Sequence, residues 1–146
     1  MDTLVGLCLL IRRFEGLKLS RYRCPAGVLT IGYGHTGRDV ALYAKSITQE
    51  KAEALLKNDA LYCLKVAKEL SPILRLYPAR QIAIADFCFN LGETRYKAST
   101  LRRCINRHHW ASAQQEMKKW VWGGGKKLPG LILRRAAEAR LLSSAQ

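Results

Sequence analysis

The sequence predicts an α+β protein that is mostly α-helical, with a small N-terminal α+β lobe joined by a long helix to a helical C-terminal lobe. Apolar residues recur at three- and four-residue spacing over most of the 146 residues, whereas residues 17–35 combine strand-forming residues with glycines. One helical pattern continues unbroken over residues 48–70, which is long enough to connect two lobes.

We expect a single domain over residues 1–146, because this length suits one domain or two small lobes with a core. Its parts are an α+β lobe over about 15–47, a linking helix over 48–70, and a helical lobe over 71–146 that packs against a helix at 3–14. A cleft should separate the lobes, and ligand sites favour such junctions.

The first helix is predicted over residues 3–14, where apolar residues share one face: Leu4, Leu7, Cys8, Ile11 and Phe14. Glu15-Gly16 ends it, so Glu15 lies on the rim of whatever follows. Residues 24–27 favour a turn and residues 28–31 a strand. The glycines that follow permit close backbone approach.

The linking helix should begin after Thr48, a good N-cap, and stop at Ser71-Pro72. Its apolar face comprises Ala52, Leu55, Leu56, Ala60, Cys63, Leu64, Ala67 and Leu70. Further helices are predicted over 79–91, 98–107, 109–120 and 129–142. Trp120, Trp122 and Gly123-Gly124-Gly125 interrupt the last two.

The charge is strongly basic: 25 Lys and Arg against 11 Asp and Glu give a net charge of +14. Such a field attracts polyanions, whether nucleic acid, anionic lipid or bacterial envelope polymers. No nucleic-acid-binding signature is present, so no nucleic-acid partner is expected. The stretch 118–135 resembles a membrane-surface segment, and the alternative is that its Trp and Leu residues are core under a solvated basic face.

The five cysteines are irregularly spaced, which argues against a disulfide framework and a zinc site. Cys8, Cys63 and Cys88 are expected in the core, and no metal or cofactor is expected. The apolar residues 4–11 follow an acid and precede Arg12-Arg13, the reverse of a signal peptide. We therefore expect synthesis in a reducing cytoplasm without a signal peptide.

Several motifs together resemble the phage-type lysozymes, the muramidase endolysins: Glu15-Gly16, Tyr22, Gly27-x-x-Thr30-Ile31-Gly32-Tyr33-Gly34-His35-Thr36, Ile47-Thr48, Phe89-Asn90-Leu91-Gly92 and Leu128-Pro129-Gly130-Leu131 with Arg134-Arg135. The resemblance covers nearly the whole chain. It implies a lysozyme-like fold and hydrolysis of the β-1,4 bond between N-acetylmuramic acid and N-acetylglucosamine in bacterial peptidoglycan, causing host cell lysis.

By this resemblance Glu15 is the general acid and Thr30 holds the hydrolytic water. A general acid must keep its proton near neutral pH, and burial against apolar neighbours such as Phe14 and Leu17 would favour this. A threonine hydroxyl can accept from and donate to one water and so fix its angle of attack. The resemblance also implies inversion at the anomeric carbon.

Cys24 stands where many members of the family carry aspartate and others carry cysteine. A thiolate here would act as a base toward the Thr30-bound water, stabilise the oxocarbenium charge or attack carbon, while a neutral thiol would only orient water. The bland alternative is a small residue in a turn. The sequence leaves these roles open.

Five further positions are candidate substrate contacts by resemblance: His35, Thr36, Phe89, Asn90 and Thr100. His35 also matches a histidine that pairs with an aspartate, here Asp59, between the lobes. The alternatives are a turn histidine for His35 and a core position for Phe89. An amide such as that of Asn90 can both donate to and accept from sugar groups.

Two other functions compete with the muramidase. One is a membrane-active cationic antibacterial protein that works without catalysis, and the other is a chitin hydrolase. The expected partners are the peptidoglycan glycan, an anionic envelope surface of lipopolysaccharide or lipid, and, by resemblance, a holin that lets a monomeric enzyme reach the cell wall in the periplasm.

Overall fold

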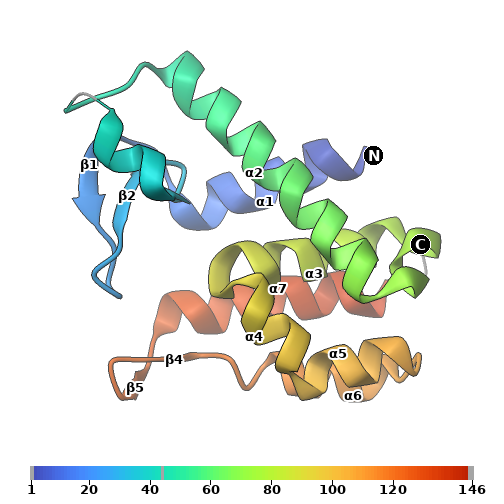
Figure 1. Cartoon of the computed structure of the whole chain (residues 1–146). Coiled ribbons are helices and arrows are strands. Elements are labelled where there is room, and N and C mark those ends of the chain that lie inside the picture. The colour runs from blue at the N-terminus through green and yellow to red at the C-terminus, as the bar shows by residue number, and fades with distance from the viewer. Residues whose placement is uncertain (1, 44, 145–146) are drawn as a thin grey trace.

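The computed structural model describes residues 2–43 and 45–144 (Figure 1). In chain order the elements are α1 (Thr3–Glu15), β1 (Lys18–Arg23), β2 (Leu29–Gly32), β3 (His35–Thr36), the 3-10 helix η1 (Arg38–Leu42), α2 (Gln49–Leu70), the 3-10 helix η2 (Pro72–Leu76), α3 (Pro78–Leu91), α4 (Glu93–Ala98), α5 (Thr100–Asn106), α6 (Trp110–Met117), β4 (Trp122–Gly123), β5 (Lys126–Lys127) and α7 (Pro129–Ser143). The predicted α+β, mostly helical class is confirmed.

Helix α1 forms as expected and carries Glu15 at its last position. The Asp2 side chain caps its start by accepting from the backbone N–H groups of Leu4 and Val5. Leu7 and Ile11 are fully buried. Gly16 ends the helix with a φ of 68°, a conformation that glycine adopts without a steric penalty.

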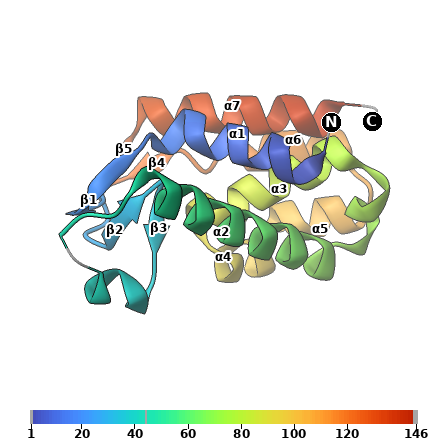
Figure 2. The ribbon, with the colours of Figure 1, turned by 90° about the horizontal axis from the view of Figure 1, so that it is seen from above.

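The small sheet is antiparallel, in the order β1-β2-β3. Thr30 in β2 lies opposite Tyr22 in β1 and Thr36 in β3. Ile31, Val40 and Leu55 form a small core beneath the sheet, so α2 contributes to the packing of the strands. The sheet lies at one end of the molecule, where the N-terminal part of α2 passes it (Figure 2).

Helix α2 has the predicted bounds and the predicted N-cap, since the Thr48 hydroxyl accepts from Lys51 N–H at 3.1 Å. Its apolar face is buried as expected, apart from a half-buried Leu70. Cys8, Cys63 and Cys88 are buried, and all five cysteines carry free thiols. Burial raises the pKa of the Cys63 thiol to about 12. It raises the pKa of the Cys88 thiol by a larger amount.

Helix α3 is the centre of the second, larger core. It packs against α1, α2 and α7. Its Phe87 is fully buried and contacts Tyr96 and Trp120 edge to face, with ring centroids 6.0 and 5.5 Å apart. Trp120 therefore belongs to the core, as one of the two sequence interpretations held, whereas Trp122 is 59% exposed.

Two details differ from the sequence prediction. The helix expected over 98–107 forms as α5 but begins at Thr100, because Ser99 leaves the helical conformation, ends α4 and caps α5 by accepting from Arg102 N–H at 3.0 Å. The glycine run after Trp122 forms a β-hairpin, since Gly124 and Gly125 both have positive φ angles at the turn between β4 and β5. Within the described ranges, no helix is long and apolar enough to cross a membrane.

A charged cluster connects the sheet to α2. His35 Nδ1 lies 2.7 Å from Asp59 Oδ2, and Nε2 lies 3.0 Å from Asp39 Oδ2, which also accepts from the Tyr43 hydroxyl. The hydrogen bond to Asp59 raises the pKa of His35, with burial opposing and the charges of both carboxylates adding. Burial alone would raise the pKa of Asp39, but hydrogen bonds from His35 and Tyr43 lower it. The expected His35–Asp59 pair is confirmed.

We predict that Asp59→Asn destabilises the protein in a pH-dependent way. Because the pKa of His35 is raised, the pair's contribution to the free energy of unfolding is fully present below about pH 6.5. This contribution is lost as the pH rises through the folded-state pKa of His35. Urea unfolding near pH 5.5 should show a loss of about 1–2 kcal/mol, and near pH 9 a much smaller one. Equal losses at both pH values would contradict the charged pair.

Candidate active site

Glu15 is held at the end of α1 by a residue 119 positions later in the chain. Its Oε2 accepts from Nη1 of Arg134, on α7, at 2.5 Å. The Glu15 side chain is 20% exposed and that of Arg134 only 4%. The surroundings therefore differ from the expected apolar wall: Leu17 is 38% exposed, and a buried cation contacts the carboxylate directly.

Arg134 is itself fixed by a completely buried carboxylate. Asp86 on α3 accepts from Nε and Nη2 of Arg134 at 2.8 Å each, a bidentate pair. The guanidinium lies between the rings of Phe14 and Phe89, 5.6 and 5.9 Å from their centroids. Burial lowers the pKa of Arg134, but the hydrogen bonds and charge of Asp86, followed by the charge of Glu15, raise it overall. Arg134 therefore stays charged and points at Glu15.

Gly34 supports the other side of the Glu15 carboxyl group. Its φ is 74°, and a Cβ atom added there would lie 2.6 Å from Oε1 and 2.8 Å from Cδ of Glu15. A side chain at position 34 would thus be strained and would also occupy the space of the carboxylate. The sequence predicted a glycine-rich turn near Glu15. Because Gly34 in this turn has no side chain, its backbone can contact the Glu15 carboxyl group.

The tip of the β1–β2 hairpin carries Cys24. Its backbone N–H donates to Val28 O at 2.9 Å, which closes the predicted turn, and its thiol is half-buried. Burial raises the pKa of Tyr22, and the charges of Glu15 and Cys24 raise it further. Tyr22 lies opposite Thr30 in the sheet and two residues before Cys24.

Thr30 lies one strand away and is 2% exposed. Its hydroxyl donates to Val28 O at 2.8 Å. A hydroxyl has one donor and two acceptor positions, so in this arrangement Thr30 can only accept a hydrogen bond from a water. From the sequence, the Thr30 hydroxyl is expected both to donate to and to accept from one water. In this structure the hydroxyl keeps only the accepting role toward a water.

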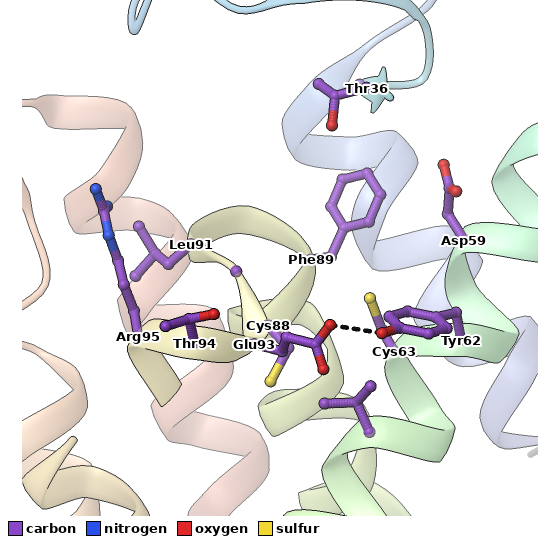
Figure 3. A pocket seen from close by; sticks show the side chains of 13 residues that line it. Thr36, Asp59, Tyr62, Cys63, Cys88, Phe89, Leu91, Glu93, Thr94 and Arg95 are labelled. Atoms are coloured by element: carbon purple, nitrogen blue, oxygen red, sulfur yellow. Dashed lines mark hydrogen bonds between the residues drawn. The ribbon is translucent and has the colours of Figure 1, made fainter. Parts of the chain in front are cut away.

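A cavity of about 640 Å³ opens at Gly34 (Figure 3). This volume is typical of sites for small molecules or short oligomers. It extends from Gly34, which touches Glu15, to α4. The residues that line it are Gly34, Thr36, Asp59, Tyr62, Cys63, Val66, Cys88, Phe89, Leu91, Gly92, Glu93, Thr94 and Arg95. Glu15, Cys24 and Thr30 are not among the described residues that line it.

Some of the candidate substrate contacts lie at this cavity and others do not. Thr36 and Phe89 line it, and His35 adjoins it through its bond to Asp59. Asn90 and Thr100 are not among the described residues that line it. The Asn90 Oδ1 accepts from Arg135 Nη2 at 2.8 Å, and the exposed Thr100 hydroxyl accepts from Arg103 Nη2 at 2.8 Å.

The sequence alone did not single out three residues of this site: Asp86, Arg134 and Gly34. Gly34 was named there only as part of a motif. Asp86 interrupts an otherwise apolar run in α3, and a lone acid in a buried helix requires a cationic partner. That pattern could have indicated a buried pair. In the described part of the chain, no group of three or more His, Cys, Asp or Glu side chains is arranged to hold a metal ion.

Comparisons with known proteins find a matching family model, similar sequences and similar structures. Residues 12–138 match the family model described as phage lysozyme. The chain is 40% identical to an endolysin of Acyrthosiphon pisum secondary endosymbiont phage 1, over 93% of this chain and 94% of the relative. It is 33% identical to a SAR-endolysin of Bacteriophage PS119, over 85% and 73% of the two chains. Its fold is similar to the muramidase domain of SpmX from Asticaccaulis excentricus, with a TM-score of 0.78, 31% identity and 95% of each chain covered.

We predict that Gly34→Ala lowers turnover at this site about 100-fold, because the new Cβ displaces the Glu15 carboxyl group and small misplacements are costly in catalysis. Gly124→Ala is the matched control: it has a φ of 58° with nothing within 4 Å, so it shares the backbone strain but not the collision. Turnover and thermal unfolding should be measured for both variants. Equal turnover of the two variants would contradict the close packing of Gly34 on Glu15.

Proposed function

The chain belongs to the phage lysozyme family, and on this premise we propose that Glu15 is its general acid, with Thr30 and Cys24 acting on the attacking water. The protein is a muramidase that breaks down bacterial peptidoglycan. The bond we assign to it is the β-1,4 link between N-acetylmuramic acid and N-acetylglucosamine. The observation that carries the proposal is the Glu15 carboxyl group, fixed between Arg134 and Gly34, a residue that lines the cavity.

On the acid side, Glu15 gives its proton to the glycosidic oxygen as the bond breaks. Arg134 holds Oε2, so the carboxyl group has one defined orientation, and the free Oε1 faces Gly34. Such positioning lowers the entropic part of the barrier. Arg134 does not reach the substrate in this account and is a positioning residue.

On the water side, we place the nucleophilic water between Thr30 and Cys24, at the tip and second strand of the hairpin. The Thr30 hydroxyl accepts one hydrogen bond from this water, because its own proton is donated to Val28 O. Cys24 as thiolate then takes the other proton while water attacks the anomeric carbon opposite the leaving group. This assignment gives inversion, the outcome of enzymes in which water separates the two catalytic groups.

The glycan is proposed to run along the cavity from Gly34 toward α4. Thr36 and Phe89 support this path, as a hydroxyl and an aromatic face suited to a sugar ring. His35 is assigned an indirect role, since both of its ring nitrogens already face carboxylates. Asn90 and Thr100 stay predictions for more distant sugar units.

We further propose that the enzyme acts on the cell wall in the periplasm as a monomer, reaching it through a membrane hole made by a holin. The hairpin β4–β5 supports contact with an anionic envelope surface of lipid or lipopolysaccharide. It exposes Trp122, with the Lys127 ammonium 5.6 Å from the ring centroid, and Lys126 beside it. Aromatic and cationic side chains together favour the boundary of an anionic layer.

The catalytic set is tested by three variants assayed together for release of reducing ends from purified peptidoglycan. Glu15→Gln keeps the shape but has no transferable proton, so we expect a loss of about 10²–10⁴-fold. Cys24→Ala should lose about 10–100-fold, and Cys24→Asp, which restores a carboxylate, should stay within about tenfold of the parent.

The anomer released first, read by NMR, distinguishes the roles of Cys24. Net inversion agrees with a water-directed role, whereas net retention would indicate a covalent Cys24 intermediate. Full turnover by Cys24→Ala would remove the thiol from the mechanism. Killing of intact cells by Glu15→Gln without release of reducing ends would favour the membrane-active alternative instead.

A further inference from the structure

We propose that Arg95 is a specificity residue that binds a carboxylate of the substrate, and so favours N-acetylmuramic acid-containing glycans over neutral chitin. The proposal rests on the proposed function, because it assigns a part of the substrate to the cavity beside Glu15. It concerns the far end of that cavity, at α4, rather than the bond that is broken.

Among the described residues that line the cavity, Arg95 is the only Lys or Arg. It lies on α4, on the opposite side of the cavity from Asp59, and its side chain extends along the cavity edge beside Leu91 (Figure 3). Its side chain is exposed. A substrate that fills the cavity would therefore meet this cation.

The two carboxylates of the cavity are both engaged elsewhere. Asp59 Oδ2 lies 2.7 Å from His35 Nδ1, and Glu93 Oε1 accepts from the Tyr62 hydroxyl at 2.5 Å. Figure 3 shows that the bond to Tyr62 directs the Glu93 carboxylate away from Arg95. Between residues 2–43 and 45–144, the Arg95 guanidinium has no hydrogen-bond or ion-pair partner. Asp59 is paired with His35 and the Glu93 carboxylate points away, so the unpaired guanidinium is complementary to an external anion.

The substrate supplies such an anion, and chitin does not. N-acetylmuramic acid differs from N-acetylglucosamine by a lactyl ether whose carboxyl group is either free or linked to a peptide that carries carboxylates of its own. A guanidinium binds a carboxylate through two parallel hydrogen bonds, which a neutral hydroxyl cannot reproduce. Val66, Leu91 and Phe89 meanwhile give the cavity an apolar side for sugar faces and N-acetyl methyl groups.

The test compares Arg95→Gln with the parent on three substrates. These are peptidoglycan with its peptides, glycan strands freed of peptide by an amidase, which carry the free lactyl carboxylate, and the same strands after methyl esterification. Lys97→Gln is the matched control, because it removes an equal charge from the same helix outside the cavity lining.

We expect Arg95→Gln to raise KM about five- to tenfold on carboxylate-bearing substrate, with kcat little changed, and to leave the esterified strands unaffected. Arg95→Lys should recover part of the loss, and Lys97→Gln should resemble the parent. A loss restricted to peptide-bearing material identifies the peptide carboxylates as the ligand, and a loss on peptide-free strands identifies the lactyl carboxylate.

Two results would overturn the assignment: an unchanged KM on every substrate, or an equal rise on the esterified strands, which would mean a structural defect. These outcomes differ from a failure of the proposed reaction. If the parent itself released no reducing ends from any of the three substrates, the muramidase bond assignment would be wrong, and Arg95 with it.

Discussion

The buried pair between Asp86 and Arg134 is the interaction on which the site depends. Asp86 is wholly buried in α3, and a carboxylate there would be strongly unfavourable without a cation. Arg134 satisfies it with two hydrogen bonds and uses its remaining amino group to hold Glu15. One guanidinium thus connects α1, α3 and α7. The packing of these three helices therefore also determines where the Glu15 carboxyl group lies.

The two halves of the proposed catalytic set are supported differently. The acid is held by buried charges. Arg135 and Glu138, both fully buried, pair within α7, and Arg135 also donates to Asn90 Oδ1, which connects α7 to α3. Burial, with the charge of Asp86 adding, raises the pKa of Glu138. Cys24, by contrast, lies at the tip of a hairpin whose first strand is largely exposed. Thr30, unlike the hairpin tip, is 2% exposed, so only the Cys24 side of the proposed water site lies near the surface.

Features set by local sequence were predictable, and features set by distant contacts were not. The N-cap at Thr48, the end of α1 at Gly16 and the buried face of α2 follow from a few adjacent residues. The motif around Gly34 and the resemblance together located Glu15 and the His35–Asp59 pair. Arg134 was recognised only as part of a basic stretch and of a motif that carries the resemblance, because nothing local shows that its charge is buried. Its partners come from elements more than forty residues away.

The central claim is that Asp86 positions Glu15 through Arg134. A double-mutant cycle on kcat, with Asp86→Asn, Arg134→Lys and the combination, tests it directly, provided that each variant is assayed where it remains folded. If the two residues act as one unit, each single variant loses about tenfold or more and the double variant loses little beyond the worse single one. Two results would contradict the account: a loss of kcat in the double variant equal to the product of the two single losses, or an unchanged kcat in Asp86→Asn.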